Sequence, residues 1–72
     1  GFKEKYEQAC KTLGLGYDTD IYQVKLNYRK LAKKYHPDIN KSPDATEKFT
    51  QVSDAYEFLT EDNIKKYKQN YM

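Results

Sequence analysis

The chain has little of what a disulfide-bonded, metal-binding or membrane-spanning protein needs. It contains one cysteine, one histidine, two prolines and no tryptophan in 72 residues. Cys10 has no second thiol for an internal disulfide, and one Cys with one His makes no recognisable metal-ligand set, so we expect no metal and no cofactor. No apolar run is long enough to span a membrane, and no signal peptide is visible. These absences favour a reducing intracellular compartment, cytoplasmic or organellar.

The length allows one small domain. We expect residues 1–72 to fold as a single unit that belongs to a longer protein. A core of this size is near the lower limit for stability without disulfides or metals. An enzyme-sized pocket, on the order of 300 Å³ or more, would remove side chains that such a core needs. The composition therefore favours a binding module, expected to be a monomer, over an enzyme.

Apolar residues at intervals of three and four predict an all-α fold. One helical stripe consists of Ile21, Val24, Tyr28, Leu31 and Tyr35, and a second of Phe49, Val52, Tyr56 and Leu59. Because a short loop joins the two segments, we expect an antiparallel helical hairpin. Leu31 and Phe49 should be buried opposite one another, or nearly so.

Residues typical of helix ends indicate two further helices. A short helix is expected over Tyr6–Leu13, ended by Gly14 and Gly16, and a last helix should begin after Thr60. The expected N-caps of the hairpin helices are Asp18, Thr19 or Asp20 for the first and Ser42, followed by Pro43, for the second.

The net charge of +2 conceals an uneven distribution. The segment from Ile21 to Pro37 has no acid and five basic residues, Lys25, Arg29, Lys30, Lys33 and Lys34. The segment from Pro43 to Asp62 has six acids and one lysine. We expect the basic helix to attract an acidic partner, and the acidic helix to neutralise it in part where the two face each other.

The tripeptide His36-Pro37-Asp38 follows the basic helix. Pro37 disfavours the α conformation at His36, so the helix should end here and present an imidazole and a carboxylate at the exposed tip of the hairpin. General acid–base catalysis is not expected, because a solvated tip neither excludes water nor holds a substrate. These groups favour contact with a partner.

A longer string surrounds this tripeptide. It reads Tyr28-Arg29-Lys30-Leu31-Ala32-Lys33-Lys34-Tyr35-His36-Pro37-Asp38-Ile39-Asn40-Lys41, and is followed by Lys48-Phe49 and Ala55-Tyr56-Glu57-Phe58-Leu59-Thr60. In this order and spacing, the chain resembles the J-domain of the DnaJ (heat-shock forty) co-chaperone family. The resemblance implies four helices, with the second and third forming the hairpin. It also implies docking onto a DnaK-type, seventy-kilodalton heat-shock chaperone, whose ATP hydrolysis the domain stimulates.

The resemblance also implies which residues bind the partner. The tripeptide would make the signalling contact, a positive docking face would lie on the second helix, and Asn40 would shape the loop. The expected partner-binding residues are His36, Pro37, Asp38, Tyr28, Arg29, Lys30, Lys25, Lys33, Lys34 and Asn40.

The chain departs from the family pattern at several positions. Ala9 and Cys10 stand where an aromatic pair is usual, which predicts looser packing or a shifted register of the first helix. Asn27 replaces a usual Ala, so it needs a hydrogen-bond partner or a place at the edge of the hairpin.

Nucleic-acid binding through the basic helix is the alternative function. Against it, the connector from His36 to about Ser42 is longer than a tight helix-turn-helix turn, and a net charge of +2 is low for a phosphate binder. An inert interaction domain is a third interpretation, which the intact His36-Pro37-Asp38 disfavours. We therefore expect a protein partner, no nucleic acid and no membrane span.

Overall fold

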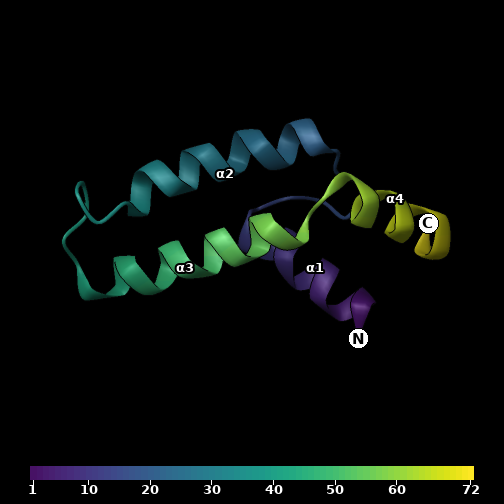
Figure 1. The fold of residues 1–72 in the computed structure, drawn as a ribbon, viewed down its shortest axis with the longest axis horizontal. Helices are drawn as coiled ribbons and strands as arrows, with labels where there is room; N and C mark the ends of the chain where they lie inside the picture. The colour runs from purple at the N-terminus through teal and green to yellow at the C-terminus, as the bar shows by residue number, and fades with distance from the viewer.

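The computed structural model describes every residue, Gly1–Met72. It contains four helices and no strand, with the helices α1 (Phe2–Thr12), α2 (Ile21–Tyr35), α3 (Pro43–Phe58) and α4 (Glu61–Tyr71). Helices α2 and α3 run antiparallel and side by side, and their connecting loop lies at the end of the molecule remote from both termini (Figure 1). Helix α1 packs against α3 near the other end of the hairpin. The all-α fold with a central hairpin is confirmed.

The expected N-caps are in place on three helices. In each case a side-chain oxygen accepts a hydrogen bond from a backbone N–H two or three residues further on, at distances of 2.9, 3.3 and 3.1 Å; the three caps are Asp20 for α2, Ser42 for α3 and Thr60 for α4. Each cap satisfies an N–H that has no partner within its helix. Pro43 occupies the first turn of α3, where its missing N–H costs no helical hydrogen bond.

Helix α1 begins earlier than predicted, at Phe2 rather than Tyr6. The Phe2 ring lies 5.6 Å from the Phe58 ring and 6.1 Å from the Tyr6 ring, centroid to centroid. These contacts bury part of the first turn against the core. Tertiary packing therefore extends a helix whose local pattern is weak.

The end of α1 is a Schellman motif built on Gly14. Gly14 has a φ of 68°, in the left-handed region that a residue with a Cβ rarely adopts. Its N–H donates to the Lys11 carbonyl at 3.1 Å, and the Leu15 N–H donates to the Cys10 carbonyl at 2.8 Å. The prediction that Gly14 ends this helix is confirmed, although the last helical residue is Thr12.

The core lies where α1 and α4 pack against the end of the hairpin that is remote from the connecting loop. Its ten buried residues are Tyr6, Ala9, Cys10, Leu13, Val24, Val52, Ala55, Leu59, Ile64 and Tyr67. Ala9 and Cys10 are therefore packed into the core, so the expectation of looser packing is wrong, whereas a shifted register of α1 stays a prediction. Aromatic volume comes instead from Tyr6, whose ring stacks on Tyr67 with centroids 4.0 Å apart.

Towards the loop, the hairpin buries its apolar side chains less than predicted. Leu31 and Phe49 are half-buried rather than buried, and Phe49 does not pack against the main core cluster. The reason is that α1 and α4 lie towards the other end of the hairpin, so that no third helix covers α2 and α3 near the loop (Figure 1). The Tyr28 and Tyr56 rings, stacked with centroids 4.1 Å apart, join the two helices at the edge of the core.

Candidate partner-binding site

The loop between α2 and α3 begins with a tight turn at His36. The backbone of His36 is extended (φ −60°, ψ 134°), which ends α2 immediately before Pro37. The His36 carbonyl oxygen then accepts hydrogen bonds from the N–H groups of Ile39, at 2.9 Å, and Asn40, at 2.8 Å. The predicted tripeptide is thus held in a hydrogen-bonded turn at the exposed tip of the hairpin.

The His36 ring is fixed by two contacts. Its Nδ1 accepts a hydrogen bond from the Asp38 backbone N–H at 3.2 Å, and the ring packs perpendicular to the Phe49 ring, with the two centroids 5.7 Å apart. The Asp38 carboxylate lies 3.7 Å from the same Nδ1 atom. That carboxylate is 85% exposed and free to meet a partner.

Asn40 connects the turn to α3. Its Oδ1 accepts a hydrogen bond from the Ser42 N–H at 3.1 Å, and Ser42 in turn caps α3. The side chain of Asn40 is half-buried and engaged within the loop. Its position supports the loop-shaping role that the sequence predicted, and direct contact of Asn40 with a partner stays a prediction.

A surface hollow of about 490 Å³ adjoins the turn. Residues from α2, the loop and α3 line it: Tyr28, Ala32, Lys33, His36, Asp38, Ile39 and Phe49. Sequence reasoning did not select Ile39, which is 64% exposed. The feature of the sequence that could have identified Ile39 is an apolar residue directly after the tripeptide. The hollow joins the tripeptide and the end of α2 in one continuous surface.

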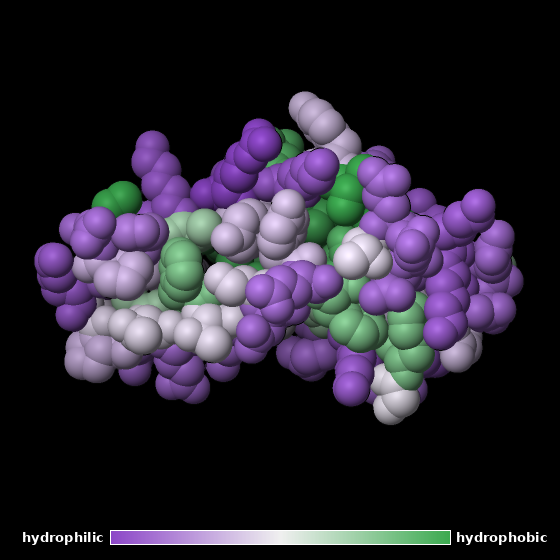
Figure 2. All heavy atoms as spheres, in the orientation of Figure 1, coloured by the Kyte–Doolittle hydropathy of each residue, from purple (hydrophilic) through white to green (hydrophobic).

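The five basic residues of α2, here called the basic face, are all exposed: Lys25, Arg29, Lys30, Lys33 and Lys34. The ion pairs of the molecule are Gly1 with Glu4, Lys3 with Glu7, and the His36–Asp38 contact, so none involves the basic face. Hydrophilic side chains project along α2 at the top of Figure 2. No ion pair joins this face to the acids of α3, because the two helices meet through their apolar stripes, so neutralisation by α3 over longer distances stays a prediction.

Tyr28 lies on the other side of α2 from most of the basic face. Its ring is half-buried and stacked on Tyr56 of α3. One face of this ring therefore packs within the hairpin, and Tyr28 also lines the hollow beside His36. The role of Tyr28 in binding stays a prediction, and its packing role is clear.

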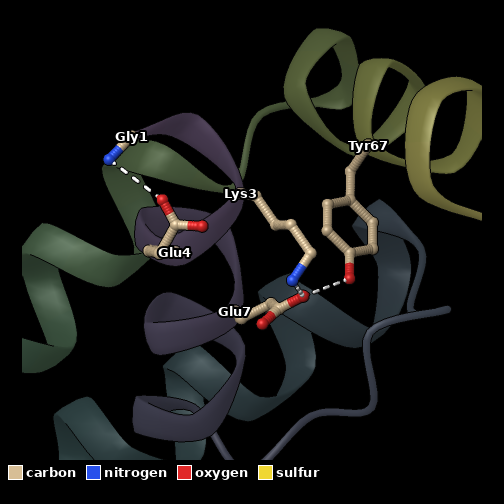
Figure 3. A network of polar contacts seen from close by, with 5 residues as sticks. All are labelled: Gly1, Lys3, Glu4, Glu7 and Tyr67. Carbon is tan, nitrogen blue, oxygen red and sulfur yellow. Dashed lines mark hydrogen bonds and ion pairs between the residues drawn. The ribbon is translucent and has the colours of Figure 1, made fainter.

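A second polar cluster lies at the opposite end of the molecule (Figure 3). The Tyr67 hydroxyl donates to Glu7 Oε2 at 2.6 Å, and Lys3 Nζ lies 3.2 Å from the same oxygen. The hydrogen bond from Tyr67, followed by the charge of Lys3, lowers the pKa of Glu7. The same hydrogen bond raises the pKa of Tyr67 to about 12. This cluster joins α1 to α4 and is remote from the loop.

The described residues give no metal site. No group of three or more His, Cys, Asp or Glu side chains is placed to hold a metal ion. Cys10 is a free, fully buried thiol, and burial raises its pKa. None of the four helices has the length and apolarity that crossing a membrane requires.

Comparison with known proteins identifies the family to which the chain belongs. The family model described as "DnaJ domain" matches residues 8–70. The "Chaperone protein DnaJ 1" of Synechocystis is 51% identical over 55 residues, 76% of this chain and 15% of that protein. The "Chaperone protein DnaJ" of Staphylococcus aureus is 53% identical over 53 residues, 74% of this chain and 14% of that protein.

A relative with a different name matches equally well. The "Curved DNA-binding protein" of Coxiella burnetii is 49% identical over 55 residues, which cover 76% of this chain and 18% of that protein. The matched segment is thus less than a fifth of the length of these relatives. No solved structure matches the chain. From the family match over nearly all its length, together with the four-helix fold, the chain belongs to the DnaJ domain family, the J-domains, which are non-catalytic co-chaperone modules.

Proposed function

We propose that this J-domain docks on a DnaK-type, seventy-kilodalton heat-shock chaperone and stimulates its ATP hydrolysis in protein folding. The observation that carries the proposal is the intact His36-Pro37-Asp38 turn beside a basic face that has no ion pair. Family membership supports the same partner. The free thiol of Cys10 supports a reducing compartment.

The two parts of the site have different tasks. Unpaired cations on an exposed helix attract an acidic surface over several ångströms and speed the encounter. The turn then makes the specific contact. Because hydrogen bonds to the His36 carbonyl already order the turn, little conformational entropy is lost when it binds.

The experiment is an ATPase assay of a DnaK-type chaperone with the wild-type domain and with Asp38→Asn. We expect Asp38→Asn to abolish stimulation while helicity and melting temperature stay near the wild-type values, because the Asp38 side chain is 85% exposed. Asp54→Asn, the same change at an exposed aspartate of α3, is the matched control and should stimulate fully. Full stimulation by Asp38→Asn would contradict the proposal.

DNA binding through α2 is the second candidate. The unpaired basic face favours it, as does the name of the Coxiella burnetii relative. That relative extends far beyond the matched 18%, so its name does not place DNA binding in this segment.

Titration with duplex DNA alongside the chaperone separates the two candidates. The variants are Asp38→Asn and the double change Arg29→Glu with Lys30→Glu. A chaperone-docking domain loses stimulation in both variants, and the charge reversal mainly slows association. Tight duplex binding that Asp38→Asn leaves unchanged, with no ATPase response, would put DNA binding first.

A further inference from the structure

Two apolar side chains of α2 face away from the core. Tyr22 is 69% exposed, the most exposed of the large hydrophobic residues. Leu26, four residues on, is only half-buried and belongs neither to the core cluster nor to the side chains packed against it. Residues four apart on a helix are neighbours on its surface. Tyr22 and Leu26 thus form an apolar pair that the fold of this domain does not use.

The pair lies on the same side of α2 as the basic face. At about 100° per residue, Arg29 and Lys33 fall within about 20° of Tyr22 around the helix axis. The buried Val24 falls about 160° away. Along the axis, Tyr22 is about 21 Å from His36 at 1.5 Å per residue. The apolar pair therefore lies at the end of the basic face farthest from the loop.

The surroundings of the pair indicate the chemistry of a partner. Lys25 and Arg29 flank it, and no carboxylate of this chain forms an ion pair with either. Trp, Tyr and Arg are the residue types most enriched among those that dominate binding energy, typically where surrounding contacts exclude water. A complementary surface has carboxylates around an apolar centre.

We propose that Tyr22 and Leu26 form an apolar anchor that binds an apolar patch, bordered by carboxylates, on the DnaK-type chaperone. The inference rests on the proposed function and adds a second contact about 21 Å from the turn. The basic residues set the rate of encounter, whereas the anchor sets how long the complex lasts.

Binding kinetics with a purified DnaK-type chaperone in the presence of ATP test the anchor. Tyr22→Ala and Leu26→Ala should each raise the dissociation rate about fivefold or more, with the association rate within about twofold of wild type. Arg29→Ala should instead lower the association rate, and this loss should shrink at high salt. Gln23→Ala changes an exposed neighbour about 100° away around the helix and should leave both rates unchanged.

The outcomes separate the anchor from the proposed function. Wild-type dissociation rates in Tyr22→Ala and Leu26→Ala, with stimulation still lost in Asp38→Asn, overturn the anchor and leave the proposed function standing. A wild-type domain that neither binds nor stimulates the chaperone overturns both. Sedimentation of the wild type and Tyr22→Ala, and titration of both with duplex DNA, provide the remaining arms. If Tyr22→Ala instead abolishes self-association or DNA binding, the apolar pair binds a second copy of this chain or DNA rather than the chaperone, and the proposal is wrong.

Discussion

The Asn27 side chain of α2 donates a hydrogen bond from Nδ2 to the Leu13 carbonyl oxygen, 2.9 Å away at the end of α1. A longer contact of 3.5 Å reaches the Gly14 carbonyl. The Schellman motif satisfies the carbonyls of Cys10 and Lys11 and leaves that of Leu13 to a side chain. The polar residue that departs from the family pattern thus fastens the hairpin to the first helix, and the first of its two predicted alternatives is confirmed.

Asn27→Ala should destabilise the domain by about 1–2 kcal/mol, because the part-buried Leu13 carbonyl loses its partner. Urea unfolding followed by circular dichroism measures this change. Gln23→Ala, an exposed position on the same helix, is the control and should be neutral within about 0.5 kcal/mol. An unchanged urea midpoint in Asn27→Ala would show that water replaces the amide without loss.

The stability lost when a leucine is truncated should depend on how deeply its side chain is buried, rather than on its position in the apolar stripe. Leu59 is fully buried, so Leu59→Ala should cost roughly 2–5 kcal/mol and leave much of the domain unfolded. Leu31 is half-buried, so Leu31→Ala should cost less, about 1–2 kcal/mol. Lys33→Ala should be nearly neutral. Thermal and urea unfolding of the three variants give the ranking, and equal losses for Leu31 and Leu59 would contradict it.

The stability of the domain should fall in acid partly through Glu7. Its pKa lies below the ordinary value of 4.5, because the Tyr67 hydroxyl and then Lys3 favour the carboxylate. A lowered pKa in the folded state stabilises the fold above pH 4.5, and this stabilisation is lost as the pH falls through the lowered value.

Glu7→Gln should therefore lower the melting temperature at neutral pH. Between about pH 5 and 3 the melting temperature of Glu7→Gln should fall less than that of the wild type. Melting curves over this range check the difference. Glu57→Gln removes an exposed glutamate of α3 that has no ion pair, and it serves as the control. Parallel pH profiles for wild type and Glu7→Gln would show that the cluster contributes nothing.

His36→Gln should abolish stimulation of the chaperone and also lower stability slightly, by up to about 1 kcal/mol. The small loss follows from the hydrogen bond to the Asp38 N–H and the edge contact with Phe49. ATPase assays and urea unfolding of the same preparations separate the two effects. Global unfolding of His36→Gln would mean that the ring is a structural residue first.

Local chemistry in the sequence determined most of the hairpin. Asp20, Ser42 and Thr60 cap their helices through hydrogen bonds to N–H groups two or three residues away, so the caps could be predicted without the fold. The end of α2 was equally predictable, since Pro37 restricts its neighbour His36 through covalent geometry. The string around the tripeptide was sufficient to indicate the family.

Only the tertiary structure decided how these elements cover one another. Helical periodicity shows which face of α2 or α3 is apolar, but not that the core stops short of Phe49. The extra turn of α1 at Phe2 likewise depends on Phe58, which is distant in the sequence. The hydrogen bond from Tyr67 to Glu7 joins residues 60 positions apart. A single sequence records local preferences, whereas these contacts depend on the packing of helices that lie far apart along the chain.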